Sequence, residues 1–185
     1  MTVVVNMLGG SGIGKSTTAA GLYYNMKLAG MNVELVREYV KVLAWQGTKI
    51  GQFDQVNIFG EQCKLEHTLY GKVDYIVTDS PILLAPIYEV FYHGDSIIEG
   101  AAVKFLKKAE SEGVKHLNII LGRNKPYDTR GRYQTEEEAL DVDKRTLQFL
   151  NEHSMPFFHV DGPDNQRVEK IKEIVNECVP RGSKD

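Results

Sequence analysis

Runs of apolar residues alternate with segments of helical periodicity along the whole chain. The apolar runs predict strands at residues 3–8, 33–36, 75–78, 117–121 and 157–160. The periodic segments predict helices at residues 15–28, 53–69, 101–112, 135–153 and 166–178. Such alternation is typical of a parallel sheet covered by helices on both faces. The predicted fold class is therefore α/β, with three layers.

Polar or glycine-rich segments follow the end of every predicted strand. Ligands of open parallel sheets bind at the carboxyl ends of the strands, so these segments predict one shared site. In chain order they are Gly9–Ser16, Arg37–Glu38, Asp79, Arg123 and Asp161–Gly162.

The segment after the first strand has the sequence Gly-Gly-Ser-Gly-Ile-Gly-Lys-Ser-Thr. It matches the phosphate-binding loop pattern, and it lies between a predicted strand and a predicted helix, as that pattern requires. Glycines let backbone N–H groups cradle phosphate oxygens, and the helix adds its positive N-terminal end. The lysine brings a charge to the β- and γ-phosphates. We therefore predict ATP binding by Gly10, Ser11, Gly12, Ile13, Gly14, Lys15, Ser16 and Thr17.

An acidic residue closes the third strand. Asp79 follows Tyr75–Thr78 directly and is the expected partner of the phosphate loop. With the Ser16 hydroxyl it is predicted to hold Mg²⁺, and it can also accept a proton during the reaction. The alternative is that Asp79 caps the next segment.

The residues after the second strand are predicted to bind the acceptor. Glu38 can take the proton of an acceptor hydroxyl, and Arg37 can bind a phosphate. Tyr39 can stack on a ring or belong to the core. Whether Glu38 or Asp79 is the general base stays open, and a surface ion pair of Arg37 with Glu38 is the simpler alternative.

A cationic loop at about residues 122–135 follows the fourth strand. It carries Arg123, Arg130 and Arg132 between glycine and proline residues, so it predicts a lid that closes over ATP and supplies catalytic arginines. The alternative is an exposed polar loop. At the adenine end we place Asp161–Gly162, bordered by Asn165 or Arg167.

Composition narrows the class of protein. The chain has 185 residues, 42% of them hydrophobic, which suits a single domain at residues 1–178; the tail at 179–185 resembles a protease-site linker. A net charge of −3 counts against an obligate nucleic-acid partner. Two cysteines give no metal spacing, and no apolar run reaches membrane-spanning length. We expect a cytoplasmic protein without a membrane partner, and the sequence leaves a homodimer open.

Together, Gly9–Thr17, Arg37–Glu38, Asp79-Ser80-Pro81 and the loop from Arg123 to Arg132 resemble the nucleoside and nucleotide kinases of the P-loop class. The nearer resemblance is to thymidylate-kinase-like and ribosylnicotinamide-kinase-like proteins, many of them from bacteriophages. Among these are kinases of 5-hydroxymethyluracil in phage DNA. The resemblance implies a five-stranded sheet of order 2-3-1-4-5, Mg²⁺ at Ser16 and Asp79, and a lid from Arg123 to Arg132. If it extends to the phage proteins, it places this chain in the host cytoplasm.

The sequence departs from thymidylate kinases after the second strand, where Tyr39 follows Glu38 in place of a Pro-Gly-like segment. The acceptor can therefore lack a phosphate or be a hydroxymethyl base. Three functions stay open: a kinase of small nucleosides or nucleotides, a kinase of a modified base within DNA, and an NTPase without an acceptor. The chain has no Asn-Lys-x-Asp motif, which disfavours GTP.

Overall fold

The computed structural model describes residues 1–124, 126–128 and 134–179, with the backbone alone at residues 44, 52 and 53. Strand β1 (Thr2–Leu8) is central, and all seven of its residues are buried. β3 (Tyr75–Thr78) and β4 (Val114–Leu121) pair with it on either side. β2 (Val33–Val36) and β5 (Phe157–Val160) form the edges. The sheet is parallel with order β2-β3-β1-β4-β5, which confirms the predicted α/β fold and strand order.

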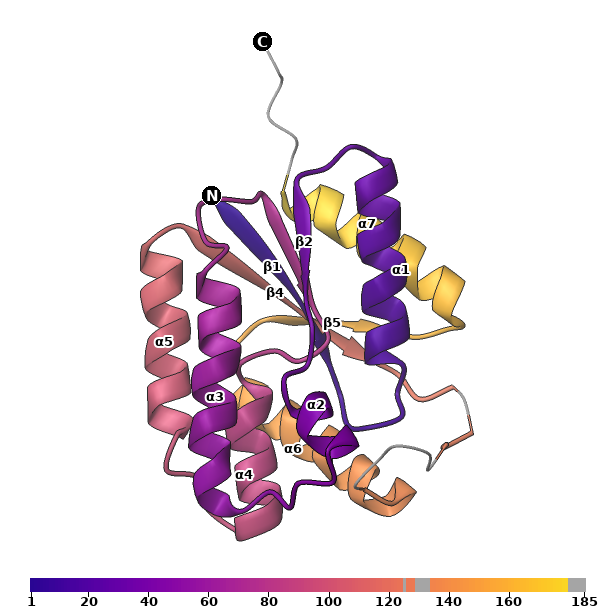
Figure 1. Ribbon diagram of the computed structural model, residues 1–185. Helices are drawn as coiled ribbons and strands as arrows, with labels where there is room; N and C mark the ends of the chain where they lie inside the picture. The colour runs from indigo at the N-terminus through magenta and orange to yellow at the C-terminus, as the bar shows by residue number, and fades with distance from the viewer. Residues whose placement is uncertain (125, 129–133, 180–185) are drawn as a thin grey trace.

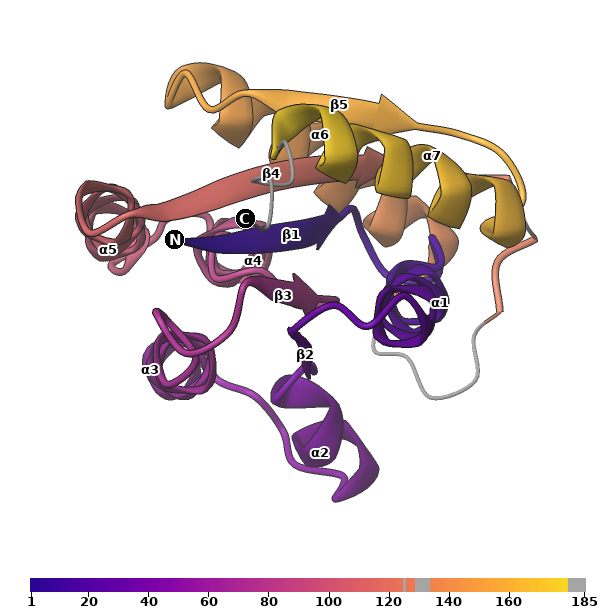
Figure 2. The same ribbon diagram turned by 90° about the horizontal axis from the view of Figure 1, so that it is seen from above.

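Helices cover both faces of this sheet (Figures 1 and 2). α1 (Lys15–Leu28) and α7 (Asp164–Cys178) pack on one face, where Val5 of β1 meets Leu22 and Ile171. The other face carries α3 (Gln52–His67), α4 (Leu84–His93), α5 (Glu99–Ser111) and α6 (Glu136–Glu152). There Leu8 belongs to a second core cluster with Ile87 and Leu150. Successive side chains of β1 point to opposite faces of the sheet, so this strand contributes to both hydrophobic layers.

Two helices of the structure were not predicted from the sequence. α2 (Val40–Trp45) has only six residues, too few to show a period. α4 is apolar on most sides and has Pro86 in its first turn, where a missing N–H costs nothing. From its sequence, α3 is predicted to pack through a face that carries Val56, Phe59, Cys63 and Leu69. This prediction is wrong in part, because Val56 is exposed whereas Gln55 and Gln62 are buried. None of the helices in the described residues is long and apolar enough to cross a bilayer.

The fold brings the strand ends together. β1, β2, β3 and β4 end at Leu8, Val36, Thr78 and Leu121, and the polar segments predicted from the sequence follow each of them directly. Because the strands are parallel, all of these segments emerge at the same edge of the sheet.

Candidate active site

The loop at Gly9–Ser16 joins β1 to α1 in the geometry of a phosphate cradle. Gly12 and Gly14 have φ angles of 80° and 104°, in the left-handed region that favours glycine. At Gly12 a side chain would also meet the ring of Tyr127, because a Cβ there would lie 2.7 Å from it. α1 begins at Lys15, so its unpaired N–H groups face the loop. Ser11, Gly12, Gly14 and Lys15 through Thr17 line the adjoining cavity; Gly10 does not, and Ile13 packs its side chain into the core.

Lys15 is held within the loop. Its Nζ donates hydrogen bonds to the carbonyls of Gly9, at 2.6 Å, and Gly10, at 3.0 Å. Burial lowers the pKa of Lys15, and the nearby carboxylates of Glu38 and Asp79 act in the opposite direction. The ends of β2 and β3 therefore place negative charge close to the lysine of the phosphate loop.

Asp79 connects those two strand ends. Its side chain is buried, and Oδ1 accepts a hydrogen bond from the backbone N–H of Glu38 at 3.0 Å. This contact fixes the chain where it leaves β2 and directs Glu38 toward the cavity. The residue after Asp79, Ser80, instead has its N–H bonded to Thr78 Oγ1 at 3.1 Å.

The three residues predicted to bind the acceptor lie in different environments in the structure. Glu38 lines the cavity, whereas Arg37 is exposed and does not. Tyr39 also lies outside the lining, and its backbone N–H donates to Gln62 Oε1 at 3.4 Å. The ring of Tyr39 is half-buried. Glu38 is thus the member of this group that faces the phosphate loop.

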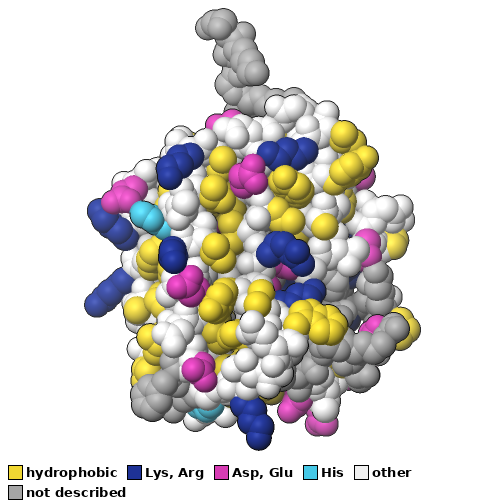
Figure 3. All heavy atoms as spheres, viewed as in Figure 1, with side chains coloured by type: hydrophobic (Ala, Val, Ile, Leu, Met, Phe, Trp, Pro, Cys, Tyr) yellow, Lys and Arg dark blue, Asp and Glu magenta, His cyan; other side chains and the backbone are white. Residues whose placement is uncertain are grey.

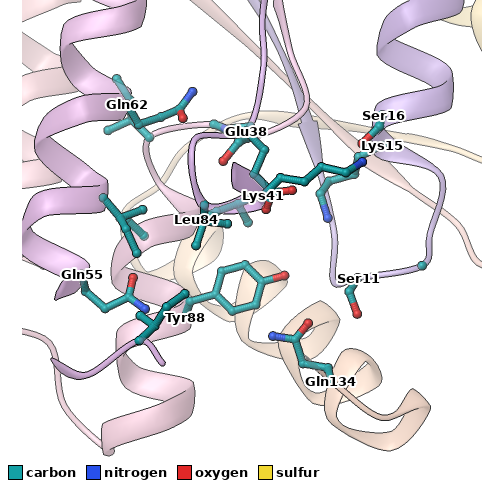
Figure 4. Close-up of a pocket in the computed structure, with 18 of the residues that line it drawn as sticks. Ser11, Lys15, Ser16, Glu38, Lys41, Gln55, Gln62, Leu84, Tyr88 and Gln134 are labelled. Atoms are coloured by element: carbon teal, nitrogen blue, oxygen red, sulfur yellow. The ribbon is translucent and has the colours of Figure 1, made fainter. Parts of the chain in front are cut away.

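The cavity has a volume of about 330 Å³, enough for a nucleoside-sized group. In Figure 4, Lys15 and Ser16 lie on one side of it and Gln55 and Gln62 on the other, with Glu38 in between. The wall between α3 and α4 is largely apolar and is formed by Ile58, Pro81, Ile82, Leu84, Ala85 and Tyr88.

Two further polar side chains stand out in the lining of the cavity. Gln62 is 2% exposed, and its Nε2 finds no hydrogen-bond partner among the described residues. An unsatisfied buried amide costs free energy unless a ligand pairs with it. Tyr88 also faces the cavity; burial, together with the charge of Glu38, raises the pKa of its hydroxyl, which stays protonated.

A carboxylate on α6 secures the phosphate loop from behind. Asp143 Oδ1 accepts the Gly10 N–H at 2.5 Å, and Oδ2 accepts Arg123 Nε at 2.6 Å. Arg123 also donates from Nη1 to the Ser11 carbonyl at 2.9 Å. Its Nη2 is buried without a hydrogen-bond partner in the described part of the chain. Arg123 is therefore anchored to the phosphate loop, at the base of the predicted lid.

The described parts of that lid contact both sides of the cavity. The hydroxyls of Tyr127 and Ser11 lie 2.7 Å apart, and Tyr127 donates to the Gln134 carbonyl at 2.6 Å. The Gln134 amide donates to the hydroxyl of Tyr92 on α4. The predicted catalytic residues Arg130 and Arg132 lie outside the described residues.

Arg167, predicted to border the adenine, lies beneath the loop instead. Its side chain is fully buried and donates to the carbonyls of Ile13, at 2.8 Å, and Gly122, and to Asn124 Oδ1 at 2.7 Å. Burial lowers its pKa. These bonds tie the phosphate loop to the end of β4.

The residues predicted for magnesium suit that ion. Among the residues that the structure describes, no three His, Cys, Asp or Glu side chains cluster as a metal cage. Mg²⁺ with a nucleotide typically uses one or two protein oxygens, with phosphates and water completing the shell. The exposed hydroxyl of Ser16 lines the cavity and supplies one such oxygen. The carboxylate of Asp79 is buried outside that lining, but it lies close enough to Lys15 to act on the pKa of the lysine and supplies the second.

Sequence reasoning missed several residues of this site. Asp143 and Asp141 look alike on a predicted amphipathic helix, and nothing in the spacing tells them apart. Tyr88 belongs to α4, which was not predicted. Gln62 is one of several amides in its helix, and only burial distinguishes it.

Comparisons with known proteins agree with this architecture. A family model described as an AAA domain matches residues 4–167. No curated protein sequence matches the chain. Deoxyadenosine kinase from M. mycoides, with the products dCMP and a flexible dCDP bound, has a TM-score of 0.62 at 19% identity and covers 94% of this chain and 99% of its own. The same enzyme with bound dATP has a TM-score of 0.58 at 20% identity, with 94% and 98% covered. These likenesses confirm the P-loop NTPase fold.

Proposed function

This chain belongs to the AAA domain family, and we propose that it is an ATP-dependent kinase that transfers the γ-phosphate to a hydroxyl of a nucleoside, nucleotide or modified base. One observation carries this proposal. Glu38 lines the same cavity as the phosphate-loop residues Lys15 and Ser16, and that cavity extends to Gln62, whose Nε2 has no hydrogen-bond partner among the described residues. A nucleotide hydrolase needs no second pocket of this size beyond its phosphate site.

The proposed roles follow from these positions. The loop N–H groups and Lys15 hold the phosphates, while Ser16 and Asp79 would hold Mg²⁺, which would neutralise phosphate charge. The oxygen of the acceptor hydroxyl attacks the γ-phosphorus while the Glu38 carboxylate takes the proton of that hydroxyl. ADP leaves with the electrons of the broken P–O bond. Asp79 is already engaged with the Glu38 backbone, which favours Glu38 as the base.

The far end of the cavity supports a base or similar flat ring as part of the acceptor. The amide of Gln62 can pair with a ring edge, and the apolar side chains of Ile58 and Leu84 can cover its faces. The structurally similar deoxyadenosine kinase acts on a nucleoside, which is consistent with this assignment. We further propose that residues 1–178 form one kinase domain and that residues 122–135 form its lid.

A modified base within DNA is the second candidate acceptor. The indole of Trp45 lies at the cavity and is 76% exposed, as expected for a stacking surface that serves a polymer. Against it, Lys and Arg side chains on the face in Figure 3 are interspersed with acidic and hydrophobic ones and form no continuous stripe. Small acceptors are therefore the first choice.

Labelled ATP tests the proposal directly. The purified protein is incubated with nucleosides, nucleoside monophosphates, nicotinamide riboside and DNA containing 5-hydroxymethyluracil. We expect label on a small acceptor; label on the polymer alone would select the second candidate. Steady ATP hydrolysis with no labelled acceptor would contradict a kinase.

Two substitutions test the assigned roles. Lys15→Ala should abolish transfer. Glu38→Gln should lower kcat by about 10²- to 10⁴-fold while ATP affinity stays within a few-fold. Glu34→Gln is the matched control, because Glu34 lies on β2 and pairs with Lys27 at the surface, at 3.0 Å. An unchanged kcat in Glu38→Gln would remove Glu38 from the role of base.

A further inference from the structure

Lys41 is a cation in the cavity to which the proposed reaction assigns no role. It lies on α2, three residues after Glu38. Of the described side chains that line the cavity, only Lys15 and Lys41 are cationic. The two lysines enter from different elements, since Lys15 comes from the phosphate loop and Lys41 from the acceptor side.

The two lysines also differ in their partners. Lys15 donates to two backbone carbonyls of its own loop. Lys41 is half-buried, and no hydrogen bond or ion pair connects it to another residue in the described part of the chain. Figure 4 shows its side chain extending from α2 toward the loop that carries Lys15 and Ser16. Its ammonium group is therefore placed for a ligand.

This position suits an anionic ligand, at the point where the phosphate loop meets the acceptor side of the cavity. An ammonium group removed from bulk water gains most from an anion that offers several oxygens at short range. In a kinase that anion is the γ-phosphoryl group, which must pass between the phosphate loop and Glu38. Lys15 and the N–H groups at the start of α1 approach that group from the loop side. Among the described side chains that line the cavity, Lys41 is the one cation that comes from the acceptor side.

We propose that Lys41 binds the γ-phosphoryl oxygens from the acceptor side. The inference rests on the proposed kinase function and adds a residue to it. As the acceptor oxygen bonds to the γ-phosphorus and the bond to the ADP oxygen breaks, charge on the γ-phosphoryl oxygens is stabilised by the ammonium of Lys41. Lys41 stays protonated throughout, and the acceptor proton goes to Glu38.

Nucleotide binding without turnover tests the contact. Titration calorimetry with Mg²⁺ compares ADP with a non-hydrolysable ATP analogue, in the absence of any acceptor. For Lys41→Met we expect about tenfold to a hundredfold weaker binding of the triphosphate analogue, as for a lost charge-assisted hydrogen bond, and ADP affinity within about twofold of native. Lys41→Arg should retain most of the preference for the triphosphate.

The matched control is Lys49→Met. Lys49 belongs to the segment that follows α2, but it is exposed and does not line the cavity. Its removal should leave both affinities unchanged. Equal losses for ADP and the triphosphate analogue in Lys41→Met would mean that Lys41 only supports the fold, and unchanged affinities would place it at an acceptor group; either result overturns the proposal.

The binding experiment separates this inference from the kinase proposal. If no acceptor is ever labelled but Lys41→Met loses triphosphate preference, the contact stands and the kinase proposal fails. If transfer is observed and Lys41→Met binds both nucleotides normally, the kinase proposal stands and the contact fails. Where transfer is measurable, Lys41→Met should lower kcat by about 10²-fold or more, with the KM for the acceptor nearly unchanged.

Discussion

At the scale of single residues, Asp143 shows how one side chain can organise a site without lining it. Its two oxygens serve two different partners, the N–H of Gly10 and the guanidinium of Arg123. Arg123 in turn reaches the Ser11 carbonyl. The phosphate loop and the start of the predicted lid are thus joined through a residue 133 positions after Gly10.

Asp143→Asn should therefore slow phosphoryl transfer, because it disturbs the position of Arg123. The amide keeps one acceptor oxygen and loses the charge, so it cannot hold both partners. We expect kcat to fall by about tenfold to a hundredfold, as is usual when a positioned group moves by about 1 Å. Steady-state kinetics on the labelled-transfer reaction measures this.

Asp141→Asn is the control for that substitution, since Asp141 lies on the same helix but pairs with Arg145 at the surface, at 2.8 Å. A double-mutant cycle with Arg123→Lys adds a readout that a purely structural effect would not move. If Asp143 acts through Arg123, the two losses will not add. Additive losses would contradict a positioning role.

Residue patterns predicted part of this site. The phosphate loop was predictable because its glycines and Lys15 follow a fixed local spacing. Glu38 and Asp79 were predictable as site candidates because they lie within two residues of a strand end. Lys41 and Asp143 were not, because their roles depend on contacts between segments distant in sequence. Charged residues on helices look alike until the helix is placed.

At the scale of elements, α6 begins with a reciprocal cap. Thr135 Oγ1 accepts the Glu138 N–H at 3.2 Å, and Glu138 Oε2 accepts the Thr135 N–H at 2.7 Å. This pairing satisfies two backbone donors that the first turn leaves open. The predicted boundary at residue 135 was correct because threonine and the acids after it are a strong local signal. α2 and α4 offered no such signal, since one is short and the other is apolar on most sides.

Thr135→Ala should lower the free energy of unfolding by about 1 kcal/mol, because Ala cannot accept the Glu138 N–H. Thr135→Ser keeps the oxygen and should stay close to native. Urea unfolding of both variants measures the difference. Equal stabilities for the Ala and Ser variants would show that the cap contributes nothing measurable to α6.

At the scale of the whole molecule, the alternation of strands and helices predicted the parallel sheet, and the resemblance to P-loop kinases implied the order of its strands. Its buried titratable groups were not predictable, since burial is a property of the assembled layers. Glu66 on α3 is 1% exposed, and burial raises its pKa to about 7, although the Tyr70 hydroxyl at 2.5 Å acts in the opposite direction. On β4, burial lowers the pKa of His116 to about 4.

These two groups make stability depend on pH in opposite directions. Between about pH 4.5 and 7 the folded protein keeps a proton on Glu66 that the unfolded chain has lost, so the free energy of unfolding falls as pH rises. Between about pH 4 and 6.5 the unfolded chain protonates His116 while the folded protein does not, so the free energy of unfolding rises with pH. The two slopes offset one another over their shared range.

Glu66→Gln should remove the opposing effect of Glu66, so that the contribution of His116 to the pH dependence of the free energy of unfolding becomes measurable. The amide is a neutral analogue of the protonated acid, so the variant avoids an ionisation that costs the native protein up to about 3 kcal/mol above pH 7. We expect it to be more stable than native at pH 8, and to lose stability steadily from pH 6.5 to pH 4. Urea unfolding at pH 4, 5, 6, 7 and 8 tests this, with Glu61→Gln, a partly exposed acid of the same helix, expected to stay within about 0.5 kcal/mol of native. A Glu66→Gln variant no more stable than native at pH 8 would show that Glu66 carries no such cost, because its charge is then accommodated in the folded layers.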